Sequence, residues 1–191
     1  YQLILRSLLE DIRNLNSLSN GLLDMAKVSS DASSIIMHAA RIDEILWEAY
    51  AELTTRKPGY IISIHFHEPI EEEKDLTVIG NPQLLKSALY NLADNGCKFS
   101  DNQTVKVHIL SSPGKVILKF SDTGIGIPQE EADKILDPFY RASNARTISG
   151  SGLGLPLTSR IILLHNGTLT IESQQGTGTT ISVELPSVNP L

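Results

Sequence analysis

The chain has 191 residues, of which 41% are hydrophobic and 20% are charged, and its formal net charge is -6. These proportions are typical of a folded globular protein, and the length allows one domain with an appendage. Because the net charge is negative and no run of basic residues exceeds two, the sequence argues against a surface built for nucleic acid or anionic lipid. The single cysteine, Cys97, excludes an internal disulfide, indicates a reducing compartment and leaves no partner for a cysteine-based metal site.

The first 27 residues show the periodicity of a long helix. Their apolar residues recur in steps of three and four, which predicts a helix of about 40 Å at ~1.5 Å per residue. Further apolar residues widen the stripe and favour a helical bundle, with a single helix packed on its own domain as the alternative. The repeat consists of Leu5, Leu8, Ile12, Leu15, Leu22 and Ala26, and it is widened by Ile4, Leu18 and Met25.

Between residues 29 and 97 we expect a helix, two strands and a second helix. Capping oxygens at residues 29–31 precede an amphipathic helix whose apolar residues run from 42 to 53. Two strands follow, at residues 60–67 and 76–79. Asn81 and Pro82 then start a helix that runs to about Cys97, with proline at its first position.

The second half of the chain contains two predicted hairpins, with strands at 105–110 and 116–120 and at 168–173 and 179–185. A short helix should follow Pro128, and a buried helix should span residues 153–165. The order of these elements predicts an α+β fold with a layer of mixed sheet and helices on one face, and it argues against a doubly wound parallel sheet.

Three polar residues form the first candidate site. Asn91, Asn95 and Lys98 are separated by steps of four and three, so they share one face of the predicted helix. Amide carbonyl oxygens can bind a metal ion, and an ammonium can contact phosphate. Taken alone, however, the same stripe is more typical of a solvated helix surface than of a binding site.

Two glycine-rich segments follow. In residues 122–128, Asp122 stands at a predicted strand end, where a carboxylate can accept from an exocyclic amine and the alternating glycines can approach a flat ligand. The plainer interpretation is a tight strand-to-helix turn. In residues 150–155, glycines open a helix and can expose N–H groups to an anion, although a lone glycine pattern is weak evidence.

A stretch with little periodicity, residues 137–151, separates the two glycine segments. Long loops of this kind are uncommon in compact domains unless they serve as lids or binding segments. Arg141 and Arg146 lie in it and could reach phosphates, whereas arginines in loops are often only solvated.

In these segments the chain resembles the two-component sensor histidine kinases. Four motifs stand in the family's order and spacing, and the resemblance extends over residues 40–186. The motifs are the N box at 91–100, the G1 box at 122–128, the F box at 137–141 and the G2 box at 150–155. Residues 1–27 resemble the second helix of the family's dimerisation and histidine phosphotransfer region, with the heptad and residues 22–26 as the weaker basis.

The resemblance implies a Bergerat-type ATP-binding fold, a two-layer α/β sandwich preceded by the long N-terminal helix. It divides the chain into a partial bundle helix at 1–28, a linker at 29–38 and a catalytic domain at 39–191. It implies ATP and Mg²⁺ as cofactors.

The resemblance also assigns roles to single residues. Asn95 would bind the magnesium ion, Asn91 and Lys98 would be the catalytic residues beside the phosphates, and Asp122 would accept the adenine amine. The other residues implied to contact the nucleotide are Phe99, Gly124, Gly126, Ile127, Phe139, Arg141, Arg146, Gly150, Gly152, Leu153 and Gly154.

Two positions depart from the family pattern without removing a ligand. Gly96 stands where the family usually has alanine, and glycine weakens a helix by up to ~1 kcal/mol relative to alanine. Pro156 stands where alanine or serine is usual, and proline is tolerated in a first turn.

The larger departure is the family's phosphoacceptor histidine, which is followed by an acidic residue and a nearby Thr-Pro or Asn-Pro. None of the five histidines has that context, so we interpret them as structural or solvated: His38, His65, His67, His108 and His165. We therefore expect a protein histidine kinase domain that acts on a histidine outside this chain, in the same or a paired subunit. The phosphoryl group would then pass to the receiver domain of a response regulator.

Because residue 1 is Tyr, we expect a piece of a longer protein, and the resemblance implies that this protein is a homodimer. We expect it to be the cytoplasmic portion of a membrane-anchored sensor, without nucleic-acid contacts and without membrane contact in this stretch. Two alternatives remain: an ATPase of the related chaperone, topoisomerase or mismatch-repair type, and a module that binds nucleotide or partners without turnover.

Overall fold

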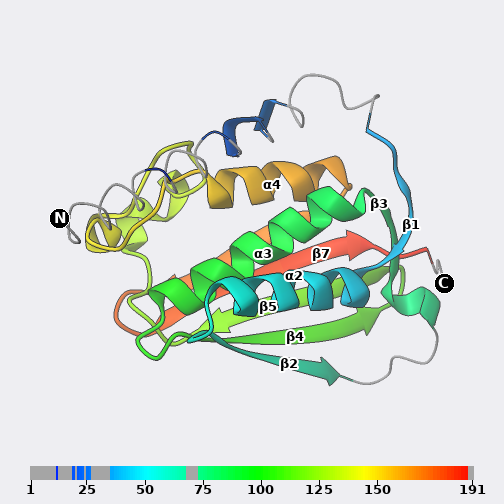
Figure 1. The fold of residues 1–191 in the computed structure, drawn as a ribbon, viewed down its shortest axis with the longest axis horizontal. Helices are drawn as coiled ribbons and strands as arrows, with labels where there is room; N and C mark the ends of the chain where they lie inside the picture. Colours follow the sequence, from blue (N-terminus) through cyan, green and yellow to red (C-terminus); the bar gives the residue numbers. More distant parts are fainter. Residues whose placement is uncertain are drawn as a thin grey trace.

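The computed structural model describes residues 12, 19, 21–23, 25–26, 35–67 and 73–188, with the backbone alone for residues 73 and 74. Its centre is a five-stranded sheet, and the helices α2 (Ile42–Arg56), α3 (Pro82–Phe99) and α4 (Gly154–Leu164) lie on one face of it (Figure 1). In spatial order the strands are β2 (Ile61–His67), β4 (Thr104–Ser112), β5 (Lys115–Asp122), β7 (Gly178–Pro186) and β6 (Thr168–Gln174). The predicted α+β class is confirmed.

The sheet is mixed, because β2 and β4 run parallel while every other neighbouring pair is antiparallel. Both predicted hairpins are confirmed, as β4 pairs with β5 and β6 pairs with β7. Parallel neighbours require a long crossover, and the connection from β2 to β4 contains α3 (Pro82–Phe99). This crossover sets α3 across the sheet.

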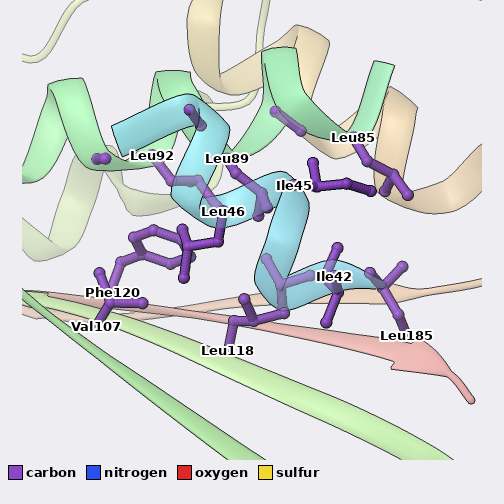
Figure 2. Close-up of a cluster of buried hydrophobic side chains, with 14 of the residues drawn as sticks. Ile42, Ile45, Leu46, Leu85, Leu89, Leu92, Val107, Leu118, Phe120 and Leu185 are labelled. Carbon is purple, nitrogen blue, oxygen red and sulfur yellow. The ribbon is translucent and has the colours of Figure 1, made fainter. Parts of the chain in front are cut away.

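The core lies between the sheet and the helices. α2 (Ile42–Arg56) and α3 turn their apolar sides toward the sheet, and α4 (Gly154–Leu164) packs beside α3. Figure 2 shows Leu118 and Phe120 of the sheet beneath Leu46 of α2. In β4, buried Val105, Val107 and Ile109 alternate with residues on the open face, as expected for a sheet covered on one side.

The start of α3 follows its sequence signals. The Asn81 side chain accepts a hydrogen bond from the Leu84 N–H at 3.1 Å, and Pro82 occupies the first turn. The structure also explains Gly96. A methyl group at Gly96 would lie 2.4 Å from Cγ2 of Val105, so glycine lets the helix lie close to β4 despite its lower helix propensity.

Three differences from the predicted elements concern short segments. Strand β1 (His38–Arg41) was not predicted, because its sequence has no apolar alternation. It pairs with β3 (Thr77–Gly80), the predicted strand at 76–79, in a separate two-stranded sheet. The helix expected after Pro128 is the 3-10 helix η3 (Gln129–Lys134). The capping residues proposed at 29–31 lie outside the described residues, and α2 begins directly after β1.

The described residues of the N-terminal segment, 12, 19, 21–23 and 25–26, are helical, and the rest of the predicted helix lies outside the described part. A methyl group at Gly21 would lie 3.5 Å from the Leu153 side chain, and Met25 packs against the core. The bundle therefore stays a prediction. Within the described residues, no helix is long and apolar enough to cross a membrane.

A buried histidine joins the end of α4 to the start of α3. Nε2 of His165 accepts a hydrogen bond from the Asn81 N–H at 2.9 Å, and Nδ1 lies 2.7 Å from the Ile161 carbonyl oxygen. Because a peptide N–H can only donate, this geometry requires the neutral ring with its proton on Nδ1. Burial lowers the pKa of His165 below its usual value of 6.5, while the Ile161 carbonyl opposes this shift.

The buried, neutral ring of His165 predicts a pH dependence of stability. The unfolded chain binds a proton at His165 more readily than the folded one, so the free energy of unfolding should fall as pH drops through 6.5. In urea titrations between pH 5 and 7.5, His165→Gln should make this fall shallower, because the variant has no imidazole to protonate at this position. His38→Gln, at an exposed histidine, is the control and should keep the wild-type slope. Equal slopes for wild type and His165→Gln would contradict the burial of a neutral His165 ring.

Candidate functional site

A cavity of about 560 Å³ opens between α3, the end of β5, the segment 135–152 and the start of α4. Most of the residues singled out from the sequence line it, although they lie far apart along the chain. Those that line it are Asn91, Asn95, Lys98, Phe99, Asp122, Gly126, Ile127, Arg141, Gly150, Gly152 and Gly154. The fold thus brings the amide stripe and both glycine segments to one site.

The polar stripe of α3 faces the second glycine segment directly. A methyl group at Gly150 would lie 3.1 Å from Nζ of Lys98, and one at Gly154 would lie 3.6 Å from Oδ1 of Asn91. Gly154 is the first residue of α4, whose N-terminal end therefore opens toward the cavity. Ammonium, amide and helix N-terminus converge here, which favours an anion.

Lys98 carries a partly buried positive charge at the cavity wall. Burial lowers the pKa of its ammonium, nearby Asp94 raises it, and the charges of Lys57 and Arg141 lower it further. Its Nζ lies 4.4 Å from the centre of the Phe99 ring. A desolvated ammonium that faces other cations is stabilised by a bound anion.

The turn at residues 122–128 is packed on both sides by backbone. A methyl group at Gly124 would lie 1.9 Å from the Phe99 carbonyl oxygen, and one at Gly126 would lie 2.0 Å from the Gln174 carbonyl oxygen. Gly126 also has φ of 60°, in the left-handed region that favours glycine. The Ile125 N–H donates to the Phe99 carbonyl at 3.2 Å, so the turn is attached to the end of α3.

The carboxylate of Asp122 stands at the end of β5, against the cavity. Its Oδ1 accepts a hydrogen bond from the Gly124 N–H at 2.9 Å. Burial raises the pKa of Asp122, while the N–H groups of Gly124 and Thr179 lower it. A half-buried carboxylate with one oxygen engaged by the backbone keeps acceptor capacity for a donor in the cavity.

Four predicted residues do not line the cavity. Gly124 is enclosed by the Phe99 backbone, and Leu153 is buried beneath the start of α4. Phe139 is 58% exposed, has a φ of 67° and donates a hydrogen bond from its N–H to the Gly152 carbonyl. Arg146 is also exposed. Gly124 and Phe139 therefore shape the backbone of the site, and direct nucleotide contact by these four residues stays a prediction.

Arg141 stabilises the lid segment, which we define as residues 137–151. Its guanidinium donates to the carbonyls of Ala145 at 2.7 Å and Arg146 at 3.3 Å, and also to that of Ile148. Arg141 lines the cavity as well, so it combines a structural contact with a charge that faces the site.

Several lining residues were not singled out from the sequence. Asp94 lies three residues after Asn91, so the helical stripe could have included it, whereas Lys57 is far away in sequence and gives no such signal. Lys57 pairs with the Asp94 carboxylate at the cavity wall. The others discussed below are Asn144 and Thr179. Among the described residues there is no group of three or more histidine, cysteine, aspartate or glutamate side chains that could hold a metal ion.

Comparison with known proteins assigns the family. Residues 80–189 match the family described as histidine kinase-, DNA gyrase B-, and HSP90-like ATPase. The chain belongs to this family. Its relatives are sensor histidine kinases, and the chain is the catalytic, ATP-binding type of domain found in them. The solved structure of the mycobacterial sensor histidine kinase MprB has a TM-score of 0.67 at 26% identity, and the match covers 82% of this chain and 100% of that chain.

Two curated relatives match this histidine kinase-type ATPase domain over nearly its whole length. The non-motile and phage-resistance protein of Caulobacter vibrioides is 31% identical over 183 residues, which cover 91% of this chain and 21% of the relative. The signal transduction histidine-protein kinase/phosphatase MprB of Mycobacterium leprae is 30% identical over 184 residues, which cover 93% of this chain and 34% of the relative. The chain thus spans only part of each relative.

The packing of the 122–128 turn can be tested by one methyl group. Gly124→Ala places it 1.9 Å from a backbone oxygen that cannot move independently, so we expect a loss of about 3 kcal/mol or more in the free energy of unfolding. Gly154→Ala is the matched control, because its methyl group has room, with its nearest contacts at 3.6 Å, and should change stability by less than about 1 kcal/mol. Urea denaturation of both variants measures the difference, and equal stabilities would refute the close approach.

Proposed function

We propose that this chain is the ATP-binding catalytic domain of a sensor histidine kinase, which transfers the γ-phosphoryl group of ATP to a histidine outside the chain. The observation that carries the proposal is the convergence of Asn91, Asn95, Lys98, Asp122 and the 150–154 segment on one cavity. A carboxylate at one wall and an ammonium with glycine N–H groups at another match the two ends of an adenine nucleotide.

The base end of the cavity has the chemistry for adenine. Asp122 accepts hydrogen bonds, and its partner in the β5–β7 register, Thr179, also lines the cavity. Apolar Ile125 and Ile127 stand beside them and suit the faces of a purine. In our proposal, Asp122 accepts the exocyclic amine while these apolar side chains exclude water from the base.

The phosphate end has the chemistry for a triphosphate. Lys98 neutralises phosphate oxygens, Arg141 adds a second positive charge, and the backbone of 150–154 supplies N–H donors at the start of α4. Asn91 stands beside Gly154, where its amide can orient the terminal phosphate. These contacts position the γ-phosphorus and stabilise charge during transfer, which is the main contribution of proteins to phosphoryl transfer.

The described residues fit a magnesium ion held mainly by the nucleotide. Asn95 presents a hard amide oxygen at the cavity wall, one helical turn after Asn91, and the cavity has no thiol or imidazole ligands. Mg²⁺ prefers oxygen ligands and commonly takes only one or two from the protein, with phosphates and water as the rest. Bound in this way, the ion would neutralise phosphate oxygens. Asn95 would hold the ion on the α3 side of the site.

The acceptor histidine belongs to another part of the protein. None of the five histidines lines the cavity: His65, His67 and His108 cluster on the sheet, His38 begins β1, and His165 is buried at the end of α4. In the proposed reaction the bond between the γ-phosphorus and the β,γ-bridging oxygen breaks, a nitrogen–phosphorus bond forms at the acceptor, and ADP leaves. The acceptor would lie on a bundle helix of the same or a paired subunit, with a response regulator as the next partner.

The domain division remains part of the proposal. We assign residues 1–28 to the bundle, 29–38 to a linker and 39–191 to the catalytic domain. Asn91 also favours a kinase over the chaperone and topoisomerase type of ATPase, because those enzymes commonly have a glutamate base at this position and use ATP to drive conformational change.

The adenine contact can be tested by changing the Asp122 carboxylate to an amide. Asp122→Asn replaces one carboxylate oxygen by an NH₂ group, so that with the remaining oxygen on the Gly124 N–H the NH₂ group faces the adenine amine. We expect the Kd for ATP, measured by calorimetry with Mg²⁺, to rise by about tenfold or more, as for a lost hydrogen bond to a charged group. Asp133→Asn, at an exposed carboxylate, is the control and should bind like wild type. Unchanged affinity in Asp122→Asn would refute the assigned contact.

Phosphoryl transfer can be tested by supplying the missing histidine. The chain, ATP labelled at the γ-phosphate and Mg²⁺ are mixed with a separate helical bundle that carries the acceptor histidine. Acid-labile, alkali-stable label on the bundle is the expected result, and Asn91→Ala should reduce its rate without abolishing ATP binding. Nucleotide binding without any transfer to cognate bundles would instead support the module without turnover.

A further inference from the structure

We infer that Asn144 is a positioning residue that docks the lid segment onto the turn carrying Asp122, and thereby keeps the base end of the cavity formed. The inference rests on the proposed function for its consequence in nucleotide binding, but the docking itself stands on contacts within the chain.

The contacts come from a single side chain. Nδ2 of Asn144 donates hydrogen bonds to the carbonyl oxygens of Gly126 at 2.9 Å and Ile125 at 3.3 Å. Asn144 belongs to the 3-10 helix η4 (Ser143–Ala145) within the lid, and its two acceptors lie eighteen and nineteen residues earlier. One amide therefore links two segments that both line the cavity.

The chemistry of the site selects an amide in this orientation. Nδ2 donates to two carbonyl oxygens, whereas the Oδ1 atom is buried without a hydrogen-bond partner among the described residues. Reversing the amide would place its oxygen against two carbonyl oxygens. The buried oxygen has a cost in free energy, which the two donated hydrogen bonds offset. A carboxylate or hydroxyl at this position cannot supply both donors.

The acceptor side of this link is rigid. The Ile125 carbonyl also accepts from the Gly176 N–H at 2.8 Å, and the Ile127 N–H donates to Oγ of Ser173 at 2.9 Å. Both contacts attach the turn to the β6–β7 hairpin. Asn144 thus attaches the lid to a turn that the sheet already holds in place.

The lid side of the link is stiff enough to transmit this anchor. The Arg141 guanidinium binds carbonyls of residues 145, 146 and 148, and the Ser143 N–H donates to Oε2 of Glu131 at 2.8 Å. These bonds tie residues 141–148 into one unit. Anchoring the unit at Asn144 therefore holds the cavity-lining Ala142 and Ala145 in position as well.

Limited proteolysis tests the docking without any ligand. Arg146 is exposed in the lid, and trypsin can cleave after it once the segment opens. Asn144→Ser is small enough to fit and too short to reach both carbonyls. We expect its cleavage after Arg146, identified by mass spectrometry, to be about tenfold faster than in wild type. Thr147→Ala, an exposed neighbour in the same segment, is the matched control and should be cleaved like wild type.

Two further measurements separate positioning from a general loss of structure. Hydrogen exchange of core amides in β4 and α3 should be unchanged in Asn144→Ser, and its Kd values for ATP and ADP should rise by the same factor, about threefold to tenfold. Cleavage at the wild-type rate, or faster exchange throughout the core, would overturn the inference. If wild type itself binds no adenine nucleotide, the proposed function fails, while the cleavage rates still decide whether Asn144 docks the lid.

Discussion

The site depends on one packing constraint, the close approach of the 122–128 turn to backbone on both sides. Residues Gly124 and Gly126 leave no space for a side chain against the Phe99 and Gln174 carbonyls. As a result, the last turn of α3, the end of β5 and the β6–β7 hairpin are held in contact. The lid then docks on this assembled unit through Asn144. The positions of Asp122 and of the α3 stripe relative to each other follow from this arrangement.

The charged side chains that line the cavity differ in their partners. Lys98, Lys57 and Arg141 line it together with the carboxylates Asp94 and Asp122, and Lys57 engages Asp94. Asp122, at the end of β5, has backbone N–H groups as partners. The partly buried ammonium of Lys98 forms no ion pair of its own among the described residues. A polyanion that carries a neutral hydrogen-bond donor at its far end is complementary to this distribution. The cavity therefore favours a nucleotide over an uncharged ligand of similar size.

The sequence predicted the elements whose signals are local. Asn81 and Pro82 marked the start of α3, and alternation marked both hairpins. It also singled out motifs whose residues line one cavity, because helical spacing and strand ends fix directions over a few residues. It could not predict contacts that depend on tertiary packing, such as Lys57 with Asp94 or Asn144 with the turn. The exposure of Phe139 could not be predicted either, since an aromatic residue beside a glycine loop can lie in the cavity or on the surface.

The most direct test is a crystal structure of the chain with a non-hydrolysable ATP analogue and Mg²⁺. The account predicts the adenine amine within hydrogen-bond distance of the Asp122 carboxylate. It also predicts the metal ion on the Asn95 oxygen and the phosphates between Lys98 and the 150–154 backbone. A nucleotide bound elsewhere, or bound here with its base away from Asp122, would contradict it.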